Sequence, residues 1–279
     1  MVLDTGETTR LGRGLQKGGT LNPHSVQTSL DCLKRFCSLC QIEGVKEIAA
    51  VGTNALRLAR DTDQFIQQVQ QECGISPRVI NEVDEAMLSF LSVQKDPCMP
   101  CDAVVMDVGG GSTEYIFGQG EGPSHPLQTI SLPLGAVSLT EEFLLHDPPS
   151  SDEMSKLRKE IEKALLRIPP ALAGELVGVG GTAATLGSMH LGLDVFDWAK
   201  VHGLLLTIDE LRAQVKELQE KDIESKKKIT GLPSDRADII LPGAMIILST
   251  MERLKKDAIH ISCHGLRYGL FYQRFMGNE

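Results

Sequence analysis

The residues with the clearest chemical potential lie between Asp107 and Glu114. An apolar run, Ala103 to Met106, ends on the Asp107 carboxylate, and the chain then passes through four small residues: Gly109, Gly110, Gly111 and Ser112. Because three successive glycines lack Cβ atoms, the backbone can approach an anion closely and point N–H groups at it. Asp107 is suited to be an oxygen ligand of a magnesium ion that bridges phosphate oxygens. The pattern predicts a phosphate-binding loop.

The residues after the glycines decide which kind of loop this is. A P-loop or a dinucleotide-binding turn needs a helix there, and a P-loop also needs Gly-Lys-Ser/Thr. Here no lysine follows, and Thr113–Phe117 is rich in β-branched and aromatic residues, which predicts a strand. We therefore expect a phosphate loop inside a β-hairpin, with an ordinary tight hairpin as the structural alternative.

An acidic cluster of Glu82, Asp84 and Glu85 precedes this loop, and Glu85 lies 22 residues before Asp107. A carboxylate beside a phosphate loop can orient or deprotonate an attacking water molecule. Taken alone, the cluster is also typical of a solvated helix start, where acidic side chains interact favourably with the helix dipole.

Composition narrows the class of protein. The 279 residues carry a net charge of −9, which argues against a nucleic-acid-binding surface. No run of eighteen apolar residues predicts a membrane span, and the first residues do not resemble a secretory leader. Seven scattered cysteines suit a reducing cytoplasm. Two Cys-x-x-Cys pairs, Cys37/Cys40 and Cys98/Cys101, could form a zinc site, but their wide separation favours core and loop cysteines.

Helical and strand-like segments alternate along the chain, which predicts a mixed α/β fold. The expected helices are 22–43, 53–57, 65–72, 84–93, 139–145, 153–166, 208–219, 242–254 and 266–275. The expected strands are 45–51, 78–80, 103–107, 113–117, 129–132, 176–179 and 259–262. Thr182, after Gly180 and Gly181, is the expected N-cap of a further short helix. His264 is interpreted as a satisfied surface histidine.

Seven sequence blocks occur in an order typical of one family. They are Thr53–Arg57, Val79–Ala86, Asp107–Glu114, Ser131–Gly135, Gly178–Thr182, Arg236–Gly243 and Gly265–Gly269. With these blocks the chain resembles the exopolyphosphatase/guanosine pentaphosphate phosphatase (Ppx/GppA) family over nearly its whole length, in its short form.

The resemblance implies the actin/Hsp70/sugar-kinase (ASKHA) fold, in which two RNase H-like α/β lobes face a central cleft. The first lobe would comprise residues 1–83, with the C-terminal helix 267–279 packing back on it. Residues 84–266 would form the second lobe, which carries the glycine-rich loop. The family's usual first hairpin, with a loop of the type Asp-x-Gly-Ser-Asn, has no counterpart in this sequence, so we expect an N-terminally incomplete first lobe.

The resemblance also assigns roles to residues. Glu85 would activate water, Asp107 and Glu114 would hold Mg²⁺, and the Gly109–Ser112 loop would bind phosphate. Arg57 and Thr53 would contact phosphate from the first lobe. For Gly180, Gly181 and Thr182, a nucleotide-binding loop and a purely structural turn remain equal alternatives.

The implied function is a hydrolase that releases orthophosphate from the end of polyphosphate or of guanosine pentaphosphate (pppGpp), a stringent-response nucleotide. A catalytically impaired regulator that binds these anions is the main alternative, since the missing hairpin would remove half of the phosphate clamp. A true start of the protein upstream of Met1 is the other explanation for the absence of that hairpin. A kinase of the same superfamily fits the Glu85-Ala86 block less well. Substrate preference, chain length, processivity and oligomeric state, with a homodimer as one option, stay open.

Overall fold

The computed structural model describes residues 3–118, 127–170 and 172–276. The chain divides into two compact units, Met1–Glu82 and Val83–Glu279. No helix in the described part of the chain is long and apolar enough to cross a membrane.

The first unit is built around a helix pair and a two-stranded parallel sheet, β1–β2. Its elements are α1 (Pro23–Ile42), β1 (Val51–Gly52), α2 (Asn54–Leu58), α3 (Thr62–Cys73) and β2 (Arg78–Val79). The start of α1 follows from its sequence, because the Asn22 side chain accepts hydrogen bonds from the His24 and Ser25 amides. Leu30 on α1 packs with Phe65 and Val69 on α3 in the small core of this unit.

One predicted strand in this unit is wrong. Residues 45–50 form no strand, and only Val51 and Gly52 pair with β2. Val45 and Ile48 are 48% and 46% exposed, so these apolar side chains do not contribute to a core. A strand needs a neighbour to satisfy its backbone groups, and the pattern of apolar residues does not reveal whether one is present.

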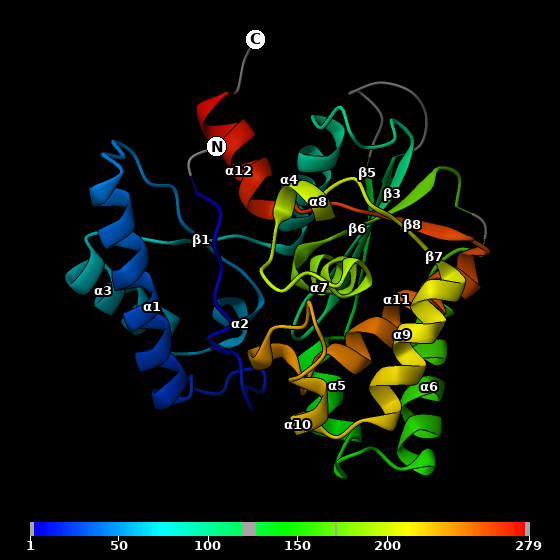
Figure 1. Ribbon diagram of the computed structural model, residues 1–279. Helices are drawn as coiled ribbons and strands as arrows, with labels where there is room; N and C mark the ends of the chain where they lie inside the picture. Colours follow the sequence, from blue (N-terminus) through cyan, green and yellow to red (C-terminus); the bar gives the residue numbers. More distant parts are fainter. Residues whose placement is uncertain (1–2, 119–126, 171, 277–279) are drawn as a thin grey trace. The chain divides into compact units, whose positions relative to one another are not determined.

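The second unit contains a mixed sheet of six strands, in the order β5-β4-β3-β6-β8-β7, in its described part (Figure 1). The strands are β3 (Ala103–Val108), β4 (Thr113–Gly118), β5 (Leu127–Leu132), β6 (Glu175–Val179), β7 (Leu205–Thr207) and β8 (Ala258–Ile261). β3, β6 and β8 run parallel, whereas β4, β5 and β7 are antiparallel to their neighbours. The predicted hairpin after Asp107 is confirmed.

Helices accompany this sheet on both faces. They are α4 (Glu82–Gln94, which begins at the last residue of the first unit), α5 (Ala136–Phe143), α6 (Ser151–Leu165), α7 (Gly180–Leu191), α8 (Trp198–Val201), α9 (Ile208–Glu220), α10 (Ile223–Lys226), the 3₁₀ turn η1 (Ser234–Arg236), α11 (Ile240–Leu254) and α12 (Leu266–Phe275). The nearly fully buried α11 packs against α5, α6, α7 and α9 (Figure 1). Capping boxes at Ser150/Glu153 and Thr207/Glu210 start α6 and α9.

Alternation along β3 divides the core into two parts. Val104 and Met106 point into the large core beneath α5, α6, α9 and α11. Val105 points into a smaller core that contains Ala86 and Val93 of α4. Because side chains alternate along a strand, Asp107 shares the face of Val105, which is the α4 face.

Helix α12 contacts α4 closely. A Cβ on Gly269 would overlap the backbone carbonyl of Leu88, so only glycine permits this approach. The expected packing of the C-terminal helix on the first lobe stays a prediction. Residues 277–279 of the predicted helix lie outside the described residues.

Candidate active site

Two carboxylates face each other at the end of the β3–β4 hairpin. Asp107 and Glu114 are directly paired in the antiparallel register, and Glu114 is paired in turn with Ser131 on β5. Side chains at paired positions lie on the same face of a sheet about 5 Å apart at Cβ. The Ser131 hydroxyl donates a hydrogen bond of 3.1 Å to Glu114 Oε1. The hairpin thus places a row of three oxygen-bearing side chains on the α4 face.

Helix α4 brings a third carboxylate to this row. Ala86 and Val93 anchor α4 on the sheet, and Glu85 precedes Ala86 in the first turn of the helix. The negative charge of Glu85 acts on both Asp107 and Glu114. The structure therefore brings together the three acidic residues to which sequence analysis assigned chemistry.

The pKa values show an excess of negative charge. Burial and, as the smaller cause, the charge of Glu85 raise the pKa of Asp107 to about 6, although the residue keeps partial exposure. Burial is also the main reason that the pKa of Glu114 is about 7; Asp107 and Glu85 add to the rise, while hydrogen bonds with Ser112 and Ser131 oppose it. A cation here would relieve both desolvation and repulsion.

The glycine turn is held by the start of α5. Its own closure is a 2.9 Å hydrogen bond from the Gly109 amide to the Ser112 carbonyl. The carbonyl of Gly109 accepts from the Ala136 amide at 2.9 Å, and that of Gly110 accepts from the Val137 amide at 2.9 Å. These bonds satisfy amides that the first turn of a helix leaves without partners. The start of α5 therefore fixes the positions of the Gly109 and Gly110 carbonyls.

Gly135 allows the glycine loop to approach the start of α5 closely. The loop also keeps backbone amides that can donate hydrogen bonds to a ligand. A Cβ on Gly135 would overlap the Gly110 carbonyl and Gly111 Cα, so the loop and α5 could not approach as they do. Within the described part of the chain, neither the Gly110 nor the Gly111 amide donates a hydrogen bond. Such amides are suited to bind phosphate oxygens.

A second glycine turn lies beside Asp107. Val179 of β6 is the parallel partner of Asp107, and the next residue, Gly180, has φ +82°. A Cβ on Gly180 would overlap Asp107 Oδ1, and a Cβ on Gly181 would overlap the Arg236 guanidinium. Only glycines therefore allow the carboxylate and the guanidinium to flank this turn.

The prediction for Thr182 is wrong. Helix α7 begins at Gly180 with Val179 as its N-cap, so Thr182 lies inside the helix. Its hydroxyl donates a 3.0 Å hydrogen bond to the carbonyl of Val108, at the end of β3. The two glycines make the turn themselves, and Thr182 instead joins this turn to the strand that carries Asp107.

Arg57 and Thr53 belong to the first unit. Thr53 precedes α2, and its carbonyl accepts a 3.0 Å hydrogen bond from the Arg57 amide. Arg57 Nη1 donates to the Ile80 carbonyl at 3.1 Å. Their contact with phosphate stays a prediction.

The donor set fits a magnesium ion. Mg²⁺ prefers oxygen ligands and is commonly held by one or two carboxylates together with water and phosphate oxygens. Asp107 and Glu114 supply two such carboxylates. The oxygens of Glu85, Asp107 and Glu114 do not all lie within 4.8 Å of one another in the described residues. A site of two carboxylates, with Glu85 left for water, agrees with this spacing.

Three further residues lie at the site, although the sequence analysis assigned them no role. They are Gly135, Ser131 and Arg236. All three lie in the blocks that carry the family resemblance, which was the available signal. What each one touches depends on segments far away along the chain.

Comparison with known proteins identifies the family. The Ppx/GppA phosphatase family model matches residues 1–276. The chain belongs to the Ppx/GppA phosphatase family. Among solved structures, that of the Ppx/GppA family member of Aquifex aeolicus is 31% identical and superposes with a TM-score of 0.81, covering 100% of this chain and 90% of that one. Ppx/GppA structures have the actin-like ASKHA fold, so the expected fold class is confirmed.

Similar proteins have three kinds of name. Exopolyphosphatase 2 of Mycobacterium tuberculosis is 27% identical, over 94% of this chain and 85% of that protein. The guanosine-5'-triphosphate,3'-diphosphate pyrophosphatase of Vibrio vulnificus is 29% identical, over 95% of this chain and 52% of its own length. A bifunctional 3-dehydroquinate synthase/phosphatase of Fusobacterium nucleatum is 30% identical over 92% of this chain, which spans 39% of that protein.

Proposed function

We propose that this protein hydrolyses the terminal phosphoanhydride bond of inorganic polyphosphate or guanosine pentaphosphate and releases orthophosphate. The observation that carries the proposal is the group of three carboxylates, Glu85, Asp107 and Glu114, beside a glycine turn with available amides. The names of the mycobacterial and Vibrio relatives support the substrate class. Both substrates end in the same phosphoanhydride group, so one site can serve either.

Hydrolysis needs a group that positions and deprotonates water. Glu85 is suited to this role because it lies in the first turn of α4, where its charge acts on Asp107 and Glu114. Its carboxylate would accept a proton from a water molecule placed in line with the scissile bond. A positioned base of this kind contributes about 10²- to 10⁴-fold in rate.

Charge on the transferred phosphoryl group must also be neutralised. Asp107 and Glu114 would hold Mg²⁺, which when bound supplies positive charge to the phosphate oxygens. The Gly110 and Gly111 amides would donate hydrogen bonds to the same group. Arg236, held beside Gly181 next to the carboxylates, would add a guanidinium contact. Arg57 and Thr53 are proposed as further phosphate contacts.

The test is phosphate release from long-chain polyphosphate and from guanosine pentaphosphate, with magnesium and with EDTA. We expect Glu85→Gln to lower kcat by about 10²- to 10⁴-fold with little change in KM. Glu82→Gln is the matched control, because Glu82 is exposed and lies on the same helix. Equal losses in both variants would contradict the role of Glu85.

The same experiment distinguishes the regulatory alternative. If the wild-type chain releases no phosphate from either substrate, the hydrolase proposal fails. Binding of polyphosphate or guanosine pentaphosphate by that inactive chain, measured by calorimetry, would support a binding regulator instead.

A further inference from the structure

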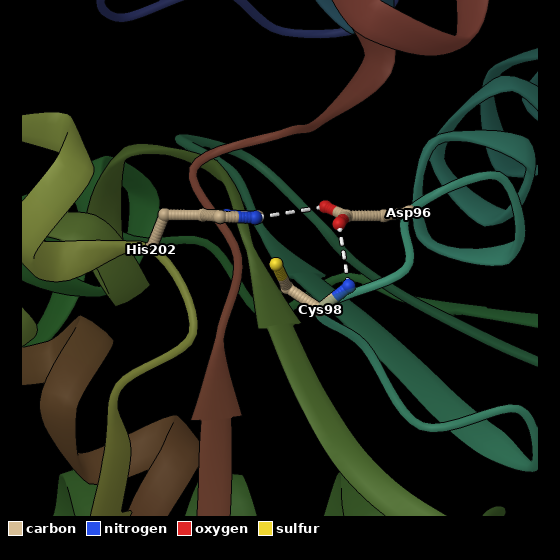
Figure 2. Close-up of side chains that lie close together, drawn as sticks. All are labelled: Asp96, Cys98 and His202. Carbon is tan, nitrogen blue, oxygen red and sulfur yellow. Dashed lines mark hydrogen bonds and ion pairs between the residues drawn. The ribbon is translucent and has the colours of Figure 1, made fainter.

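A second cluster of metal-binding side chains lies in the second unit, apart from the three carboxylates. Asp96 and Cys98 come from the connection between α4 and β3, and His202 follows α8. Figure 2 shows the three side chains pointing toward one another from these separate segments. His264, between β8 and α12, lies beside them.

The distances within this cluster are short. Asp96 Oδ2 lies 2.9 Å from His202 Nε2 and 2.9 Å from His264 Nδ1. One ligand atom each from Asp96, Cys98 and His202 lies within 4.8 Å of the other two. No other such set of three was found in the described ranges 3–118, 127–170 and 172–276. The expectation that His264 is a surface residue is wrong, since its side chain is 15% exposed and its ring is stacked on Tyr268.

One buried carboxylate oxygen lies at the centre of the cluster and is shared by two imidazole rings. The side chains of Asp96 and His202 are 3% and 8% exposed. Asp96 Oδ2 forms close ion pairs with His202 Nε2 and His264 Nδ1, but neither contact has the geometry of a hydrogen bond. Buried polar atoms usually have partners at good geometry. A cation bound between these atoms would give them such partners.

We propose that Asp96, Cys98 and His202 form a binding site for a zinc ion. The donors are a carboxylate, a thiolate and an imidazole, the set that zinc accepts and magnesium does not. Zinc bonds of about 2.0–2.3 Å in tetrahedral geometry place ligand atoms about 3–4 Å apart, which is within reach of the observed spacing. Water or His264 would complete the coordination. The site is independent of the proposed hydrolysis.

The backbone turn at Asp96 and Cys98 positions these two ligands. The Cys98 amide donates a 3.0 Å hydrogen bond to Asp96 Oδ1, and the Met99 amide donates to the Asp96 carbonyl at 3.1 Å. This turn directs the other carboxylate oxygen and the Cys98 sulfur toward the same point (Figure 2). Pro97 between them restricts φ, so little conformational entropy remains to be lost when a metal binds.

His202 has to change its tautomer to become a ligand. The backbone amide of Cys263 donates a 3.2 Å hydrogen bond to His202 Nδ1, so in the neutral ring the proton is on Nε2. Ligation requires a neutral ring with a free lone pair on Nε2. Coordination through Nε2 moves the proton to Nδ1 and breaks the bond from Cys263. The Cys263 amide is therefore a reporter of metal binding.

The site would connect to the glycine turn beside Asp107. His264 is followed by Gly265, which lies against the backbone nitrogen of Gly180: a Cβ there would be 3.7 Å from that atom. The His264 carbonyl also accepts a 2.8 Å hydrogen bond from Ser92 of α4. A bound zinc ion would thus hold together the segments between α4 and β3, after α8, and between β8 and α12.

The test uses the whole chain, stripped of metal and titrated with Co²⁺ and then with Zn²⁺. We expect one Co²⁺ per chain, with a charge-transfer absorption band characteristic of a thiolate ligand, and displacement of that band by Zn²⁺. Cys98→Ser should abolish the band. Cys101→Ser is the matched control, because Cys101 is the other exposed cysteine of the same motif and should leave the band unchanged.

A second readout does not depend on sulfur. Zinc should shift the amide resonance of Cys263 in the wild-type chain and not in His202→Ala, whose folding is checked by circular dichroism. The proposal is overturned if the wild-type chain binds no Co²⁺ at a one-to-one ratio. It is equally overturned if Cys98→Ser retains the thiolate band or if Cys101→Ser loses it. None of these results depends on phosphate release.

Discussion

The buried carboxyl group of Glu114 gives a prediction whose size follows from the structure. Because the pKa of Glu114 is raised from 4.5 to about 7, the folded chain keeps a proton between these values that the unfolded chain has released. Unfolding therefore releases protons, and the free energy of unfolding falls as the pH rises through this window. The full rise corresponds to about 3 kcal/mol, since one pKa unit is equivalent to 1.36 kcal/mol.

Replacing Glu114 with glutamine should remove this penalty. Glutamine has the shape of the protonated acid, and its carbonyl oxygen can still accept the hydrogen bond from Ser131. Below about pH 4.5 the variant should match the wild type. At pH 8 without divalent cations, Glu114→Gln should be more stable by about 3 kcal/mol. It should also lose activity, because a proposed metal ligand is missing.

Urea denaturation between pH 4 and 8, in EDTA, measures this difference. Glu142→Gln, which changes an exposed glutamate, is the control and should follow the wild type throughout. Adding magnesium at pH 8 should stabilise the wild type and reduce the advantage of Glu114→Gln. A variant that is destabilised equally at pH 4 and pH 8 would refute the reasoning, because it would show that the ionised Glu114 carries no penalty.

Three other substitutions test the surroundings of the site. Gly180→Ala should destabilise the protein more than Gly192→Ala. Both glycines have positive φ, but only a Cβ at position 180 would overlap the Asp107 carboxylate. Thermal unfolding should show a difference in stability of about 1–3 kcal/mol between the two variants. Thr182→Val should lower the free energy of unfolding in urea by about 1–3 kcal/mol and weaken phosphate binding, because it removes the hydrogen bond to Val108. The Thr185 hydroxyl bonds within its own helix, so Thr185→Val should leave phosphate binding intact. Arg236→Gln should raise KM for polyphosphate by about 10- to 100-fold with a smaller effect on kcat, and an unchanged KM would exclude a phosphate contact.

Local chemistry explains the parts of the structure that sequence predicted well. Asn22 and Pro23 define the start of α1 through capping and a fixed φ. The β-branched and aromatic residues after Gly111 correctly predicted a strand and not a helix. Apolar periodicity located most other helices to within a few residues. These features depend on neighbours only a few positions apart.

Errors occurred where a residue's partner is distant. The strand predicted over 45–51 shrank to two paired residues, because strand formation depends on a neighbouring strand. Thr182 was expected to cap α7, yet its hydroxyl bonds Val108, 74 residues earlier in the chain. His264 was expected at the surface, but the Asp96 carboxylate, from the connection between α4 and β3, lies against it.

The sequence by itself determined the chemistry available to this protein: a carboxylate followed by a glycine turn, an acidic helix start and ordered blocks typical of Ppx/GppA phosphatases. Only the tertiary structure decided which groups act together. Register pairs Asp107 with Glu114, and α4 adds the charge of Glu85, which raises both pKa values. Likewise Cys98 meets His202, 104 residues away, instead of another cysteine. Such proximity comes from sheet order and helix packing, which no local pattern of residues encodes.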